Sequence, residues 1–153
     1  MKPLMAYLFI LSSVCCSKEP DLEKERASII ALLDMERKAH FEKNVSLFMS
    51  EFSDSMVSVN KGAVVLMEKE KMRKRIQEYF DGVEFLKWDD MVAPKISFSE
   101  DARLAYAVVE KQVILSIRDR SSALQDTTDF AWVAIYRKIG CEWKLECNVS
   151  TNK

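Results

Sequence analysis

Glycine and proline are scarce in this sequence of 153 residues, which has three of each. The glycines fall where a turn or a helix end is expected, and the chain contains no internal repeat, low-complexity stretch or Pro/Gly-rich segment. The sequence therefore offers no place for a linker between domains. Hydrophobic residues make up 48% of the chain and charged residues 31%, as in ordinary globular proteins. We expect a single domain with one core.

An excess of charge of either sign is also lacking, since 23 basic residues nearly balance 24 acidic ones. Such a chain has no long-range field to gather phosphates, so we expect no nucleic-acid partner. Metal ligands are equally scarce, because the sequence has one histidine. A phosphate-binding glycine loop and a Gly-x-Ser-x-Gly nucleophile motif are missing too. The sequence predicts neither a metal nor any other cofactor.

The apolar run at residues 4–11 is too short to span a membrane, which takes about 20 apolar residues. With a basic residue before it and small residues after it, the run is typical of an export signal. Cys15 and Cys16 follow directly, and a cysteine at that junction resembles the bacterial lipoprotein signal. We expect residues 1–16 to be an export signal, of lipoprotein type or plainly cleaved, and residues 17–21 to be a tether. The protein would then lie in the bacterial cell envelope, with a lipid on one of these cysteines as its membrane contact.

Two further cysteines, Cys141 and Cys147, invite a disulfide in an exported protein. On one strand the residues between them span roughly 20 Å, whereas bridged Cα atoms lie within about 7 Å of each other. We expect two buried free thiols instead.

Hydrophobic periodicity predicts helices first and strands afterwards. Apolar residues recur at helical steps in the first half, whereas the second half is rich in β-branched and aromatic residues with turn signals between the runs. The predicted helices cover residues 21–43, 45–51 and 68–81, and the predicted strands cover 52–60, 63–67, 83–88, 95–99, 104–117, 127–138 and 142–149. A mostly antiparallel, curved sheet packed on helices defines an α+β fold. Residues 22–153 form its single domain.

Particular residues are expected at the ends of these elements. Asp21 is placed to cap the first helix, and Gly82 to cap the end of the third. Asn60, Lys61 and Gly62 have turn chemistry, so the strands beside them should form a hairpin. In the last strand, alternation predicts one face with Trp143, Leu145, Cys147 and Val149, and an opposite face with Lys144, Glu146 and Asn148.

Four segments stand out in this order of elements: Glu36-Arg37-Lys38-Ala39-His40, Ser58-Val59-Asn60, Lys87-Trp88-Asp89-Asp90, and the ending from Phe130-Ala131-Trp132-Val133 through Trp143-Lys144. With that order, they resemble the nuclear transport factor 2-like superfamily, in particular its SnoaL-like exported members, over about the whole mature chain. Many SnoaL-like chains carry a Gly-Asp pair where Lys43 and Asn44 stand here.

The resemblance implies a cone in which the sheet wraps around the long first helix and leaves a mostly apolar pocket between them. Members often pair through the sheet, so it also implies a homodimer. The superfamily includes isomerases, dehydratases, polyketide cyclases and epoxide hydrolases, and also binding or dimerisation modules. The fold by itself therefore does not give the function.

His40 is the first candidate site residue. At about 100° per residue it lies within about 20° of Leu33, the centre of the apolar stripe of the first helix. Glu36 and Arg37 flank that stripe, and Glu36 is four residues before the histidine, within hydrogen-bond reach. His40 is therefore a candidate general acid or base oriented by Glu36. The alternative is a core histidine with one satisfied hydrogen bond.

Other polar residues have two interpretations as well. Asp54 is a candidate pocket carboxylate, but its place between two serines also suits a helix-to-strand junction. Asp89 and Asp90 cannot share a proton, because adjacent strand residues face opposite ways. The aromatic candidates for the pocket wall are Trp88, Tyr106, Trp132 and Tyr136. Aromatic residues are equally suited to a hydrophobic core.

The function predicted first is a binding module: an exported, dimeric cone whose pocket holds a small molecule or a partner's peptide. Glu36, Arg37 and His40 would form its polar end. The alternative is a cofactor-independent isomerase, dehydratase or cyclase in which His40 carries the proton. A third candidate is a structural dimer whose sheet surface is the functional part.

Overall fold

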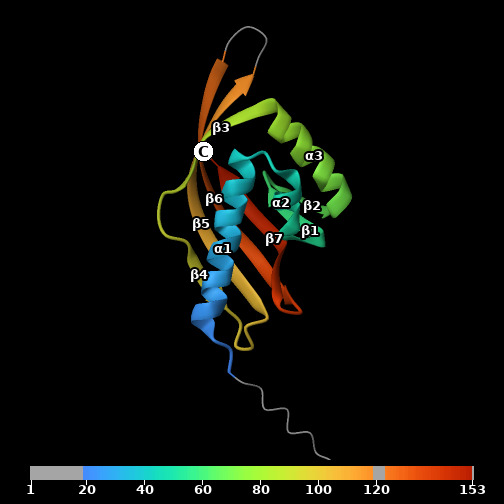
Figure 1. The fold of residues 1–153 in the computed structure, drawn as a ribbon, viewed down its shortest axis with the longest axis vertical. Coiled ribbons are helices and arrows are strands. Elements are labelled where there is room, and N and C mark those ends of the chain that lie inside the picture. Colours follow the sequence, from blue (N-terminus) through green and yellow to red (C-terminus); the bar gives the residue numbers. More distant parts are fainter. Residues whose placement is uncertain (1–18, 119–122, 153) are drawn as a thin grey trace, which may run out of the picture.

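The computed structural model describes residues 19–118 and 123–152, and the predicted export signal with Cys15 and Cys16 lies outside them. Helices come first in the chain and long strands last (Figure 1). The elements are α1 (Leu22–Phe41), α2 (Val45–Ser50), β1 (Phe52–Asn60), β2 (Ala63–Glu68), α3 (Lys69–Gly82), β3 (Val83–Asp90), β4 (Lys95–Phe98), β5 (Leu104–Arg118), β6 (Ala123–Ile139) and β7 (Glu142–Asn152). The predicted α+β fold is confirmed. Within the described ranges, no helix is both long and apolar enough to cross a membrane.

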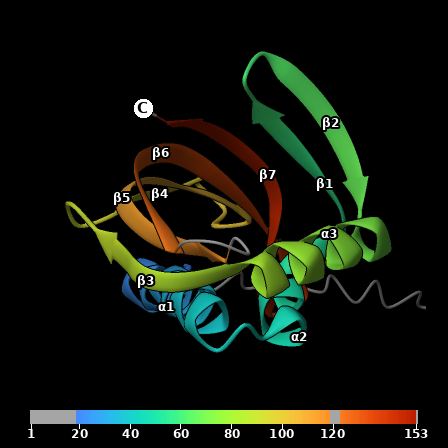
Figure 2. The ribbon, with the colours of Figure 1, turned by 90° about the horizontal axis from the view of Figure 1, so that it is seen from above.

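The sheet is curved and mostly antiparallel. Its strands follow the order β2-β1-β7-β6-β5-β3, β4 pairs with β5 beside β3, and the β1–β7 pair is parallel. Seen from above, the sheet bends while the three helices lie along one side of it (Figure 2). A bent sheet with helices on one side buries its inner face and leaves a hollow near the helices.

Local chemistry explains where several elements begin and end. Asp21 caps α1 as predicted, accepting a hydrogen bond of 3.2 Å from the Lys24 N–H. Lys61 and Gly62 both have positive φ, which suits the two-residue turn of the predicted β1–β2 hairpin. The third helix ends at Gly82 as predicted, but the capping role is wrong. Gly82 is the last helical residue and has no positive φ, Val83 is the C-cap, and the chain continues directly into β3.

A bulge in β7 changes which side chains face the helices. Tyr136 pairs with Leu145, but Ile135 pairs with Cys147, so Glu146 is an extra residue in β7. Before the bulge Leu145 is buried, and after it Asn148 turns toward the helices. The predicted strict alternation of this strand is therefore wrong, because one inserted residue exchanges the two faces.

The remaining cysteines carry free thiols. Cys147 is half-buried, on the outer side of the bulge, but Cys141 is exposed in the turn between β6 and β7. The expectation of two buried thiols is wrong. The turn that starts at Gly140, with φ of 62°, carries Cys141 out of the sheet, and Cys147 is only half-buried.

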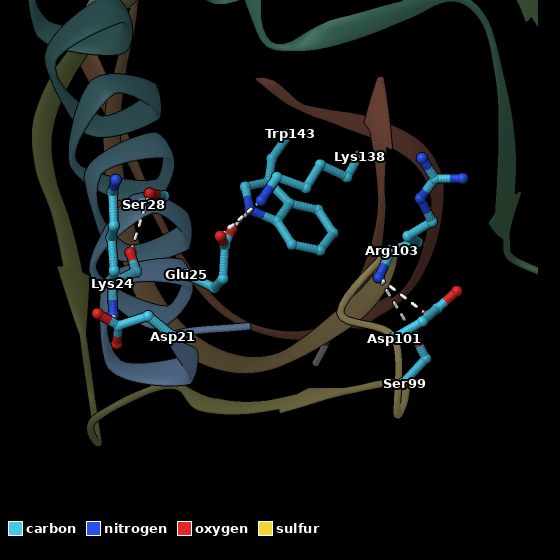
Figure 3. Close-up of polar contacts among 9 residues, drawn as sticks. All are labelled: Asp21, Lys24, Glu25, Ser28, Ser99, Asp101, Arg103, Lys138 and Trp143. Carbon is cyan, nitrogen blue, oxygen red and sulfur yellow. Dashed lines mark hydrogen bonds and ion pairs between the residues drawn. The ribbon is translucent and has the colours of Figure 1, made fainter. Parts of the chain in front are cut away.

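Polar contacts fasten the start of α1 to the sheet. The Glu25 carboxylate reaches from the helix toward Lys138 and Trp143 (Figure 3). It accepts a hydrogen bond of 2.7 Å from Trp143 Nε1 and forms an ion pair with Lys138. The Lys138 bond is the main reason that the pKa of Glu25 is lowered, and the Trp143 bond adds to the effect. We call these three residues the closed end of the hollow, because their polar groups are bonded to one another.

Candidate functional site

Glu36 borders two cavities between the helices and the inner face of the sheet in the described chain. The larger has a volume of about 380 Å³, and its walls are formed mostly by aromatic and methionine side chains from α2, β1, β2 and α3. The smaller, of about 160 Å³, lies against β3, β6 and β7. Glu36, Tyr79 and Asn148 border both cavities. We call this region the open end of the hollow. Apolar walls with a few convergent polar groups are typical of small-molecule sites.

Glu36 is the carboxylic acid at the junction of the two cavities. It lies on the side of α1 that faces the sheet, because it follows Ile29 and Leu33 at helical spacing and both of these are buried. Burial raises the pKa of Glu36 to about 7, and Asp90 adds to the rise while Lys111 opposes it. An acid with this pKa exchanges protons near neutral pH.

Lys111 is a buried cation on the inner face of β5. Only 2% of its side chain is exposed, and Nζ forms an ion pair of 2.8 Å with Asp90 Oδ1. The ammonium group also lies 5.9 Å from the centres of the Trp88 and Trp132 rings. Sequence reasoning missed Lys111, although it occupies the inward register between the buried Val109 and Val113.

Glu51 and Tyr136 are two further buried acidic groups near Glu36. Glu51 follows α2 directly and is 4% exposed, and Leu145 N–H donates to its main-chain oxygen over 2.7 Å. Burial raises the pKa of Glu51 to about 9, with a further contribution from Glu36. Burial also raises the pKa of Tyr136 well above its usual value. Both groups are therefore neutral at pH 7. Sequence reasoning missed Glu51, because an acid at a helix end usually faces solvent.

His40 lies outside both cavity linings. It is 3% exposed, and its Nδ1–H donates to the main-chain oxygen of Glu36 over 2.7 Å, so the Glu36 carboxyl group does not orient the ring. The imidazole stacks on Trp88 at 3.7 Å between ring centres. Three more rings meet it edge-on, those of Phe48, Phe80 and Phe85. Burial lowers the pKa of His40 to about 4, which keeps it neutral at pH 7.

The other predicted site residues divide into two groups. Trp88 and Trp132 line the smaller cavity. Arg37 is half-exposed and bonds the Trp88 carbonyl and Asp89, each over 3.1 Å, which ties α1 to β3. Asp54 is exposed on β1, and Tyr106 is 47% exposed on the outer face of the sheet. The fold therefore brings Glu36, Trp88 and Trp132 together at the cavities. The predicted residues that line neither of these two cavities include Arg37, Asp54, Tyr106 and the buried Tyr136.

Asn148 is a cavity residue that strict alternation along the strand does not predict. The bulge at Glu146 places it opposite Ala134, whose side chain is buried on the inner face of β6. A bulge has no reliable sequence signal, so Asn148 was expected on the opposite face. Among residues 19–118 and 123–152, no three His, Cys, Asp or Glu side chains gather in a group that could hold a metal ion.

Comparison by sequence finds no matching family model and no matching curated protein. Solved structures do match. A ketosteroid isomerase-like protein from Erwinia carotovora atroseptica superposes with a TM-score of 0.64 at 15% identity, over 84% of this chain and 96% of that one. An NTF2-like protein from Pseudomonas putida gives 0.65 at 12% identity, over 88% and 89%. Another from Rhodospirillum rubrum gives 0.64 at 15% identity, over 80% and 96%.

These likenesses span nearly the whole described chain and share one architecture. The protein therefore has the nuclear transport factor 2-like fold that its sequence resembles. At such low identity the comparisons establish the fold alone, and the chemistry has to be argued from the open end of the hollow.

Proposed function

We propose that this protein binds a small, largely apolar molecule at the open end, with Glu36 as the main polar group. The observation that carries the proposal is the lining of the site: about 380 Å³ of space bordered mostly by apolar side chains, with Glu36 as the one carboxyl group among them. A cavity of this size suits a small molecule better than a peptide. The methionines Met56, Met67 and Met72 in its wall can adapt to ligands of different shape.

A cavity-filling variant tests this proposal. Ile76 lines the larger cavity from α3, so Ile76→Trp should occupy the space that a ligand needs. Lys74→Trp adds the same side chain to the exposed side of the same helix and serves as the matched control. With the neutral dye Nile red as probe, we expect blue-shifted emission with the wild type and the control, and a much weaker signal with Ile76→Trp. Equal signals from all three proteins would contradict the proposal.

A second candidate function is acid/base catalysis, and the raised pKa of Glu36 favours it. A general base works best when its pKa is near the working pH, and burial brings Glu36 to about 7. The candidate base is then Glu36. The alternative base is His40, which the sequence suggested and whose pKa is about 4. The ring opening of 5-nitrobenzisoxazole, which begins with removal of one C–H proton, distinguishes them. If Glu36 is the base, the rate should rise through about pH 7, and it should be lost in Glu36→Gln but kept in His40→Ala.

We also propose a homodimer through the outer face of the sheet. The register of the strands aligns one row of mostly apolar residues across five neighbouring strands: Leu66, Val57, Cys147, Ile135 and Tyr106. A parallel row contains Val149, which is 41% exposed. A contiguous apolar surface of this kind favours a partner surface of the same type. Sedimentation equilibrium should give a dimer for the wild type and a monomer for Val149→Asp.

Export, lipid attachment and membership of the SnoaL-like group remain predictions from the sequence. Mass spectrometry of the protein from bacterial membranes tests the first two. A lipid mass on a new N-terminal Cys15 or Cys16 would support them, whereas an intact Met1 would contradict them.

A further inference from the structure

Two polar atoms beside the smaller cavity make no hydrogen bond within the described part of the chain. They are Trp88 Nε1 and Asn148 Oδ1, both buried from solvent. The Trp88 side chain is only 8% exposed, and both side chains belong to the cavity lining. Buried polar groups are normally paired, because leaving one unpaired loses the hydrogen bond it would make to water. Two more buried atoms in the described chain are unpaired, Glu51 Oε1 and Ser53 Oγ, but neither residue lines either cavity. The two atoms at the smaller cavity are therefore the ones that a bound molecule can reach.

The chemistry of the two atoms is complementary. An indole N–H can only donate a hydrogen bond, and an amide oxygen can only accept one. A hydroxyl group does both, so a single such group has the acceptor that Trp88 needs and the donor that Asn148 needs. A carboxylate can only accept, and it would also lie near Glu36, the charged residue of this lining. An ammonium group can only donate, which would leave Trp88 unpaired.

Resting on the binding function proposed above, we infer that the smaller cavity is a subsite for the hydroxyl group of a neutral, largely apolar ligand. The hydroxyl oxygen accepts from Trp88 Nε1, and its hydrogen is donated to Asn148 Oδ1. The apolar body of the ligand extends toward the larger cavity, since Glu36, Tyr79 and Asn148 line both cavities.

The surrounding charges agree with a neutral ligand. The nearest buried cation, Lys111, is already paired with Asp90 at 2.8 Å and so does not call for an anionic ligand. Arg75 lines the larger cavity from α3 but is not part of the lining of the smaller one, to which both unpaired atoms belong. An anionic ligand would therefore be held by Arg75 and would leave Trp88 and Asn148 unsatisfied.

Three probes with apolar chains of similar length separate these cases: 1-octanol, octyl methyl ether and octanoate. The ether can accept but cannot donate, and octanoate is an anion. We expect 1-octanol to bind roughly threefold to tenfold more tightly than the ether, the effect of about one net hydrogen bond. Asn148→Leu should remove this preference, whereas Asn152→Leu, an exposed change on the same strand, should preserve it.

A direct measurement on the unaltered protein accompanies the variants. In ¹H–¹⁵N spectra, the indole N–H signal of Trp88 should move downfield when 1-octanol binds. The Trp143 signal should stay in place, because that N–H already donates to Glu25 over 2.7 Å.

The outcomes separate failure of this subsite from failure of the binding function. If none of the three probes displaces Nile red, the binding function fails. If the ether binds as tightly as 1-octanol and the Trp88 signal does not move, the apolar cavity stands but the hydroxyl subsite is overturned. Tighter binding of octanoate that is lost in Arg75→Gln would also overturn it, since the polar group would then be a carboxylate.

Discussion

The two ends of the hollow use the same residue types in opposite ways. At the closed end, Glu25 on α1 meets a lysine and a tryptophan from the sheet and bonds with both. At the open end, Glu36, three turns further along the helix, also has a lysine and a tryptophan nearby. There, however, Lys111 pairs with Asp90, and the Trp88 N–H makes no hydrogen bond in the described chain.

The pKa values of Glu25 and Glu36 differ in the same sense as their pairing. Its lysine and tryptophan partners lower the pKa of Glu25, whereas burial raises that of Glu36. Paired polar groups stabilise a fold, and unpaired ones at a cavity reduce stability unless a ligand satisfies them. We therefore regard the closed end as structural and the open end as the place where binding occurs.

His40→Ala tests whether the role of a residue depends on whether its polar groups are hydrogen-bonded, rather than on whether it lies near the open end. His40 is near the open end, but its Nδ1–H is bonded and four rings enclose it. His40→Ala should lower the free energy of unfolding by about 3 kcal/mol, because it leaves a void in a packed core. Urea denaturation measures the loss, with the exposed Lys38→Ala in the same turn as control. A loss below about 1 kcal/mol would mean that the histidine is not part of the core.

Breaking the closed end should have the next largest effect. Glu25→Ala leaves Trp143 Nε1 and Lys138 without their shared acceptor, so we expect a loss of about 2 kcal/mol in the free energy of unfolding. Glu23→Ala, an exposed acid in the first turn of the same helix, should change it by less than about 0.5 kcal/mol. Equal effects of the two changes would argue against a structural closed end.

The corresponding change at the open end should have the opposite sign. The pKa of Glu36 is about 7 in the folded state against a usual 4.5. Between these values the folded protein holds a proton that the unfolded chain has lost, so stability falls as pH rises from about 4.5 to 7. Glu36→Gln removes that loss and should be more stable than the wild type by about 1 to 3 kcal/mol at pH 8, with no such gain at pH 4.

Thermal unfolding at the two pH values checks this prediction. Asp34→Asn, an exposed change on the same helix, controls for the loss of one negative charge. If Glu36→Gln is destabilising at pH 8, the carboxylate is stabilised in a way that the buried environment does not explain.

The sequence predicts the fold well because periodicity and turn residues are local signals. The α1 cap at Asp21 and the Lys61-Gly62 turn follow directly from nearby residues. The candidate site is less predictable, because it depends on contacts between distant elements. Helical geometry correctly turned Glu36 toward the sheet, but it could not tell that aromatic rings would enclose His40 or that Arg37 would reach Trp88 and Asp89 outside the cavities.

Asn148 shows most clearly why the candidate site cannot be predicted from the sequence. Alternation assigns it to the outer face, and the single extra residue at Glu146 reverses that assignment. Lys111 was missed for a different reason. A lysine within an apolar run is usually taken as a solvent-facing interruption, and its pairing with Asp90 becomes visible only when β3 lies beside β5.

The smallest predicted effect on stability distinguishes a ligand site from an ordinary defect in packing. Asn148→Leu replaces an unpaired amide with an apolar side chain of similar size, so the free energy of unfolding should stay within about 0.5 kcal/mol or rise by about 1 kcal/mol. Chemical denaturation measures it, with Asn152→Leu as control. If Asn148→Leu is instead strongly destabilising, Asn148 is paired within the fold and the open end resembles the closed end. If the variant is as stable as the wild type yet loses its preference for 1-octanol, Asn148 is present for binding rather than for folding.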